Sequence, residues 1–175
     1  MKLFTLLIIL VLLLACSEKS KPGRNQLLVG MYKLFKIEVQ DSTGQWHDEW
    51  ASDGTGYIIY DGIGHMAVQI TPKGYEQFNT LSEDESIDPG KLKTKIDSMP
   101  AEQLKASLEE FISNYAYTGN YSVSDSVDIV THYRLTHTIP SAWNTAVQRR
   151  FIFKGDTLEL YNDVDKRRLK WIKQK

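Results

Sequence analysis

Histidine is the side chain best suited to acid–base or metal chemistry near neutral pH, and this chain has four: His47, His65, His132 and His137. His65 lies in the stretch GYIIYDGIGHMAVQI, at the start of a predicted strand. A general acid or base needs oriented partners within hydrogen-bond reach. Near His65 the sequence offers only a tyrosine and Asp61, and turn formation already explains Asp61. We therefore assign no catalytic residue.

The spacing of the histidines also argues against a metal site. His132 and His137 have opposite parity along one predicted strand, which would place them on opposite faces. His47 lies in a predicted loop. No pair is spaced i, i+4 on a helix or i, i+2 on a strand, as two imidazoles on one metal would require. We predict no metal ligand and no cofactor, and only a metal site assembled from distant segments remains open.

The N-terminus, MKLFTLLIILVLLLACSEKS, has an apolar run that ends at the only cysteine, Cys16. The run is shorter than the roughly 20 residues of a membrane-spanning helix, so residues 1–15 are predicted to be a signal peptide. Leu-Leu-Ala-Cys resembles the lipobox of bacterial lipoproteins. The resemblance implies that Cys16 carries acyl chains such as palmitate and becomes the first mature residue. The alternatives are a signal peptide that merely contains a cysteine and an uncleaved anchor.

A lipidated Cys16 predicts a protein tied to a membrane of the bacterial cell envelope without crossing it. Ser17 after the cysteine favours the outer membrane where the cell has one. Residues 16–26 are polar, contain Pro and Gly, and are predicted to form a flexible tether. Residues 27–175 are long enough for one domain with its own core. The net charge of −1 provides no field for binding nucleic acid, so no nucleic-acid partner is predicted.

The elements that would position these side chains are mostly strands. About eight short runs of β-branched and aromatic residues are separated by turn signals, which is typical of a sandwich or barrel. One helical insertion interrupts them between the third and fourth strands, with helix starts at Asp88-Pro89 and at Ser98, where Pro100 would lie in the first turn. Its second helix is amphipathic, which predicts a helix lying on the core, with contact to a membrane as an alternative.

The hairpin around His65 suggests which side chains face inward. If Tyr60 pairs with His65, alternate residues of the two strands share one face, and one of the two faces is almost entirely apolar. We expect that apolar face to line the barrel interior. That face consists of Tyr57, Ile59, Met66, Val68 and Ile70. His65 would then point away from the cavity. The opposite assignment, which gives a more polar cavity, remains open.

Further candidates come from later strands. In AVQRRFIFKG, Arg149 shares a face with Phe151, and an arginine inside a barrel needs a partner because burying a charge is costly. Arg149 would stack on an aromatic ring or pair near the rim, or else it would meet the acidic head of an amphiphile beside Tyr133. His132 and Arg134 are predicted on the outer face. Trp143 is either a lid or a loop anchor.

Several motifs in order resemble the bacterial and fungal lipocalin-like domain family over residues 28–173. They are VGMYKL, GYIIYDGIGHMAVQI, AYTGNY, VTHYRLTHTIPSAW, QRRFIFKGDTLEL and RLKWIK. The resemblance implies an eight-stranded antiparallel barrel with a short helical segment and small hydrophobic ligands. It carries over no catalytic residue. Two departures are Tyr32, where the family usually has Trp, and a longer connection over residues 74–99.

The sequence thus predicts a lipid-anchored envelope protein that binds a small hydrophobic or amphiphilic molecule. The predicted ligand-binding residues are Tyr57, Ile59, Met66, Val68, Tyr133, Trp143, Arg149 and Phe151. One alternative is a structural or adaptor lipoprotein whose barrel is filled by its own side chains. A second is a barrel isomerase or cyclase, which would need a carboxylate or histidine buried near the cavity. The sequence leaves any protein partner unknown.

Overall fold

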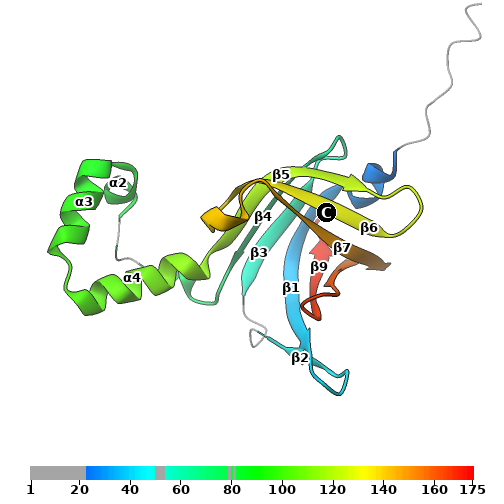
Figure 1. Cartoon of the computed structure of the whole chain (residues 1–175), viewed down its shortest axis with the longest axis horizontal. Coiled ribbons are helices and arrows are strands. Elements are labelled where there is room, and N and C mark those ends of the chain that lie inside the picture. Colours follow the sequence, from blue (N-terminus) through cyan, green and yellow to red (C-terminus); the bar gives the residue numbers. More distant parts are fainter. Residues whose placement is uncertain (1–22, 50–53, 79, 81) are drawn as a thin grey trace, which may run out of the picture.

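The strands form a closed barrel. The computed structural model describes residues 23–49, 54–78, 80 and 82–175. In this part of the chain nine strands form one antiparallel sheet with the order β2-β1-β3-β4-β5-β6-β7-β8-β9, and β1 also pairs with β9. Eight strands therefore close a barrel, and β2 lies beside the end of β1 (Figure 1). The predicted all-β barrel is confirmed. The strands are β1 (Gly30–Gln40), β2 (Trp46–Asp48), β3 (Thr55–Tyr60), β4 (His65–Thr71), β5 (Tyr115–Val123), β6 (Ile129–His137), β7 (Thr145–Lys154), β8 (Thr157–Asn162) and β9 (Arg167–Lys173).

The helical insertion follows β4, the third barrel strand, as predicted. It contains the 3₁₀ turn η2 (Tyr75–Gln77) and the helices α2 (Glu83–Ile87), α3 (Pro89–Ser98) and α4 (Ala101–Ser113). Asp88 caps α3 by accepting the backbone N–H groups of residues 90 and 91. The helix α2, which was not expected, begins with a capping box between Ser82 and Glu85.

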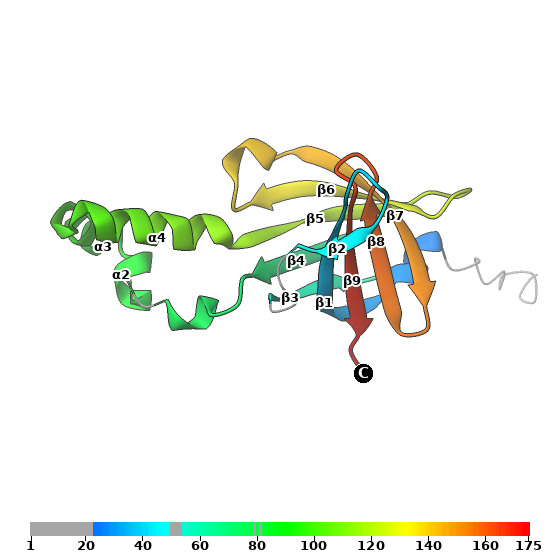
Figure 2. The same cartoon turned by 90° about the horizontal axis from the view of Figure 1, so that it is seen from below.

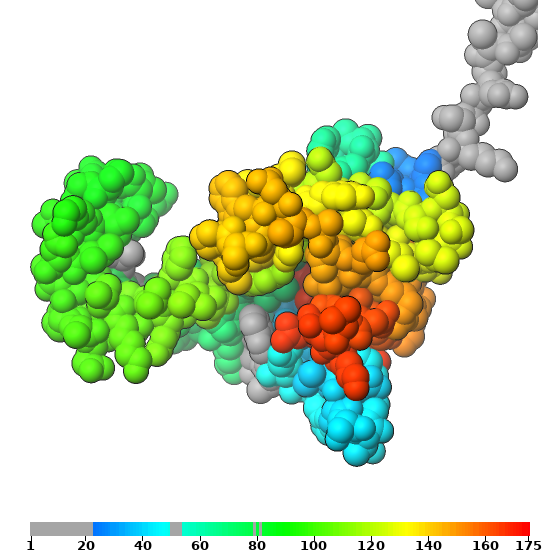
Figure 3. Space-filling view, viewed as in Figure 1, coloured from blue at the N-terminus to red at the C-terminus, as the bar shows by residue number. Residues whose placement is uncertain are grey.

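The expectation that the amphipathic helix lies on the core is wrong. No residue of α2, α3 or α4 is buried, and the apolar side chains Leu104, Leu108, Phe111 and Ile112 of α4 are exposed. The helices form an arm that projects from the barrel (Figures 1 and 2), and Figure 3 shows it standing out from the barrel's body. Within the described residues, no helix is both long and apolar enough to cross a membrane.

The barrel end opposite the arm is plugged by the 3₁₀ helix η1 (Arg24–Leu28), as Figure 2 shows. Leu28 is fully buried, and the hydroxyl of Tyr32 donates to its carbonyl at 3.1 Å. The Tyr121 hydroxyl donates to the carbonyl of Asn25 at 3.0 Å. Residues 24–26, which we assigned to the tether, are thus part of η1, and Tyr32 is the buried aromatic residue at this closed end. The predicted signal peptide, Cys16 and most of the tether lie outside the described residues.

A β-bulge between β5 and β6 changes which side chains of β6 point inward. The pairing shifts between Thr118, opposite Thr136, and Gly119, opposite Arg134. A Cβ atom on Gly119 would lie 1.9 Å from the carbonyl oxygen of Tyr133, so only glycine permits this close approach. Residues on either side of a bulge lose their simple alternation. Both His132 and His137 are consequently buried, although their parity in the sequence is opposite.

Candidate ligand-binding cavity

The barrel has a cavity of about 360 Å³ at its open end, from which the arm extends. Its apolar wall is formed by side chains from five strands: Ile37, Ile70, Tyr115, Val147 and Leu169. Polar side chains complete the lining: Glu49, Arg134, Arg149, Asn162, Asp165 and Arg167. A volume of this size falls within the range of small-molecule sites.

Next to the cavity, on the inner faces of β3, β5 and β6, lies a buried polar cluster. The Nε2 atom of His132 lies 2.8 Å from the hydroxyl oxygen of Tyr60, and its Nδ1 atom lies 2.8 Å from that of Tyr117. His132 is 1 % exposed. Burial, reinforced by Arg149 and Arg134, lowers the pKa of His132 to about 3, while burial raises the pKa of Tyr60 well above its usual value. The imidazole is therefore neutral, so one ring nitrogen donates and the other accepts.

His137 joins the same cluster. Its ring stacks on that of Tyr117, with the ring centroids 5.5 Å apart and an angle of 9° between the planes. It also forms a T-shaped contact with the ring of Tyr115, with centroids 4.8 Å apart. Its Nδ1 atom accepts the backbone N–H of Ile139 at 2.8 Å. Burial and the nearby Arg134 lower the pKa of His137, so it too is neutral at pH 7. The prediction that His132 lies on the outer face, apart from His137, is wrong because of the bulge.

Two arginines face this cluster. Arg149, predicted inside on parity, lines the cavity and acts electrostatically on Tyr60, Tyr117 and His132. Arg134, predicted outside, also lines the cavity, and its Nε and Nη2 atoms donate to the Thr145 hydroxyl at 3.0 and 2.6 Å. The β6–β7 side of the cavity therefore carries two positive charges.

The predicted hairpin register is wrong by one residue. Tyr60 pairs with Met66, and Ile58 pairs with Val68, because five residues, 61–65, connect the last pair, one more than in a turn that places Tyr60 opposite His65. Within this connection the Asp61 N–H donates to the His65 carbonyl. A shift of one position moves a whole set of side chains to the other face. Ile58 and Tyr60 thus point inward, with Met66 and Val68 as predicted.

The register places Tyr57 and Ile59 outside, where they are 41 % and 43 % exposed. They line a depression of about 460 Å³ on the outer surface of β3 to β6 instead of the interior. Met66 and Val68 are buried at 4 % and 5 % exposure. They do not line the cavity at the open end.

The remaining predicted residues are divided between core and surface. Phe151 is buried in the core, while Tyr133 is 44 % exposed and points outward because His132 points inward. Trp143 is half exposed, and its Nε1 donates to the carbonyl of His137 at 2.6 Å. It thereby anchors the loop that contains η3 (Pro140–Ala142). Of the eight predicted ligand-binding residues, the structure brings only Arg149 into the wall of the open cavity.

His65 lies on the outside of the barrel, as expected. Its Nδ1 atom lies 2.6 Å from Oδ2 of Asp61, whose Oδ1 accepts the backbone N–H groups of residues 63, 64 and 65. Burial raises the pKa of Asp61, but these hydrogen bonds lower it by more, so the pKa is about 2. His65 and Asp61 thus complete a turn. No three His, Cys, Asp or Glu side chains of the described segments cluster as metal ligands.

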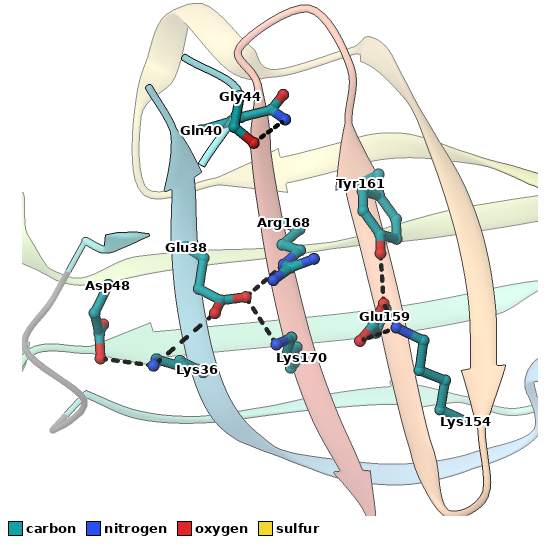
Figure 4. A network of polar contacts seen from close by, with 10 residues as sticks. All are labelled: Lys36, Glu38, Gln40, Gly44, Asp48, Lys154, Glu159, Tyr161, Arg168 and Lys170. Carbon is teal, nitrogen blue, oxygen red and sulfur yellow. Dashed lines mark hydrogen bonds and ion pairs between the residues drawn. The ribbon is translucent and has the colours of Figure 1, made fainter. Parts of the chain in front are cut away.

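A second polar network lies on the outer surface, where β1 meets β9 and closes the barrel (Figure 4). Glu38 is buried and contacts Arg168, and it also accepts from Lys170 at 2.9 Å. Glu159, 3 % exposed, pairs with Lys154 at 3.0 Å. Glu38 of β1 joins Arg168 and Lys170 of β9, so the network supports barrel closure, and none of its members lines the cavity.

The eight-stranded antiparallel barrel of this chain is plugged at one end and hollow at the other. This architecture places the chain in the class of lipocalin-like barrels. The model of the lipocalin-like domain family matches residues 29–174, and the chain belongs to this family. The comparisons with curated proteins and with solved structures found no match.

Proposed function

We propose that this protein binds a small hydrophobic or amphiphilic molecule in the open end of its barrel. The observation that carries this proposal is the cavity of about 360 Å³, whose apolar wall is built from five strands. Removing apolar surface from water stabilises a complex by about 25 cal/mol per Å². Ile37, Ile70, Val147 and Leu169 offer such a surface to the apolar body of a guest.

The alternative of an adaptor with a filled barrel has less support, because a cavity of about 360 Å³ remains at the open end of the barrel. The isomerase or cyclase alternative required a buried histidine near the cavity, and His132 fits that description. Both of its ring nitrogens are bonded to tyrosine hydroxyls, however, and it does not line the cavity. We therefore favour binding over catalysis.

We further propose that the barrel is held at the bacterial cell envelope by acyl chains on Cys16. The described chain begins beside η1, at the barrel end opposite the arm (Figure 2). The residues that line the cavity lie toward the end that carries the arm. A tether attached at the closed end would leave the cavity unobstructed.

Native mass spectrometry of protein lacking residues 1–16 tests ligand binding, because all described strands and the buried core lie within residues 23–175. We expect a bound small molecule, released by organic extraction, and a thermal shift when it is added back. A consistently empty barrel with no thermal shift across amphiphiles would overturn the proposal.

The anchor is tested with the full chain expressed in bacteria. Labelled palmitate should be incorporated, and the protein should fractionate with membranes. The Cys16→Ala variant should lose the label. Incorporation that persists in this variant would refute lipidation at Cys16.

A further inference from the structure

The two cavity arginines have no carboxylate partner in the part of the chain that the structure describes. Among the described residues, neither Arg134 nor Arg149 forms an ion pair: Arg134 bonds to Thr145, and Arg149 donates to the Gln148 carbonyl at 3.3 Å. Both are partly buried. A partly desolvated cation is costly without an opposite charge, and two such cations beside the same neutral cluster repel each other.

The acidic side chains of the cavity are occupied elsewhere. Glu49 pairs with Arg167, and Asp165 accepts from the side-chain amide of Asn162. Asn162 ends β8, Asp165 lies in the turn that follows, Arg167 begins β9 and Glu49 follows β2. The cavity therefore divides into a rim whose charges are paired and a β6–β7 side whose positive charges are not.

The position of Arg149 in the register places it inside the barrel rather than at the rim. Arg149 pairs with Val130, which is fully buried, whereas Val147, two residues closer to the open end, pairs with His132. The cluster beyond it is neutral, since Tyr60, Tyr117 and His132 all hold their uncharged forms. No nearby group of that cluster compensates the guanidinium.

From this arrangement we infer that the guest is an amphiphile with a carboxylate head, which Arg149 and Arg134 bind while the apolar wall covers its chain. A guanidinium presents donors in a planar fork that matches the two oxygens of a carboxylate. Ile37, Ile70 and Leu169 lie on the other strands around the cavity and contact the chain. The inference rests on the proposed function and specifies the ligand class for the same cavity.

The test compares decanoate with decanol, which have the same chain and differ in the charge of the head. Binding to delipidated protein lacking residues 1–16 is measured by calorimetry. Charge-assisted hydrogen bonds lead us to expect roughly 10- to 100-fold tighter binding of decanoate. Arg149→Met and Arg134→Met should each weaken decanoate binding by about tenfold or more and leave decanol binding within about threefold.

Arg150→Met is the matched control, because Arg150 lies on the same strand, stacks over Tyr161 and pairs with Asp163 on the outside. It should keep the wild-type preference. Arg149→Lys, which keeps the charge but loses the planar fork, should retain a smaller preference for decanoate and shows whether the position tolerates substitution. Equal affinity for the two ligands, or an unchanged preference in Arg149→Met, would overturn the inference alone. If neither ligand binds, and no carboxylate of another chain length from hexanoate to tetradecanoate binds, the inference and the proposed function are both overturned.

Discussion

The Nε2 atom of His132 lies 2.8 Å from the hydroxyl oxygen of Tyr60, although 72 positions separate the two residues in the chain. The contact crosses the interior from β6 to β3. Both groups are buried and neutral, so the bond satisfies two polar atoms that water cannot reach.

Removing this hydroxyl should destabilise the barrel. In Tyr60→Phe, the Nε2 atom of His132 loses its partner while buried, which costs about 1–3 kcal/mol. Urea unfolding at pH 7 should show a lower midpoint. Tyr57→Phe is the control, since Tyr57 is on the same strand but points outward. Equal midpoints for the two variants would contradict the assigned bond.

The same site predicts a loss of stability as the pH falls. Folding lowers the pKa of His132 from about 6.5 to about 3, so between these values the unfolded chain binds a proton that the folded chain excludes. The stability contribution is fully present above pH 6.5 and is lost as the pH falls toward 3. Between pH 7 and pH 5 the loss should reach about 2 kcal/mol.

The measurement is urea unfolding of wild type and His132→Gln at both pH values. The variant should lack this part of the pH dependence, whatever its stability at pH 7. Val130→Ala is the control, because it makes a neighbouring cavity without removing a titrating group. It should be less stable than wild type but should keep the wild-type pH dependence. An identical pH dependence in His132→Gln would show that His132 titrates normally in the folded state.

Much of the fold could be predicted because its signals are local. Turn residues, strand alternation and caps such as Asp88 indicated the strands, the helical insertion and the start of α3, whereas α4 begins at Ala101 and not at the predicted Ser98. The site was harder because one-residue shifts decide which side chains face inward. The turn after Tyr60 moved Tyr57 and Ile59 outside, and the bulge at Gly119 moved His132 and Arg134 inside. The apolar face of α4 gave no indication that the helix projects away from the core.

Gly119 should tolerate no side chain. In Gly119→Ala, the new Cβ would lie 1.9 Å from the Tyr133 carbonyl oxygen, so β5 and β6 would have to separate or lose the bulge. We expect a loss of about 3 kcal/mol or more in unfolding experiments, at the upper end of overpacking costs. Gly23→Ala serves as the control, since no atom lies within 4 Å of the position that its new Cβ would take. A wild-type midpoint for Gly119→Ala would exclude this bulge geometry.

Barrel closure should depend on Glu38. Burial raises its pKa, but hydrogen bonds from Arg168 and Lys170 outweigh that effect and the net pKa is lowered. Glu38→Gln removes the negative charge between these two cations and should cost about 3 kcal/mol, as for a broken buried pair. Asp97→Asn, which removes an exposed pair with Lys93, should cost less than about 1 kcal/mol. If Glu38→Gln and Asp97→Asn lower the unfolding free energy by similar amounts, Glu38 does not have this role in closure.

The arm should be dispensable for folding. Ile70 pairs directly with Tyr115, so Thr71 and Asn114 leave the sheet opposite each other and a two-residue turn can join them. Replacing residues 72–113 with Asn-Gly should therefore leave the melting temperature of the barrel within a few degrees of wild type, because α2, α3 and α4 bury no side chain. The same turn in place of residues 138–144 is the contrasting control, since it removes Trp143 and its bond to the His137 carbonyl. That variant should melt clearly earlier. If the first replacement prevents folding, the arm contributes to the barrel through contacts that the exposed surfaces of its helices do not explain.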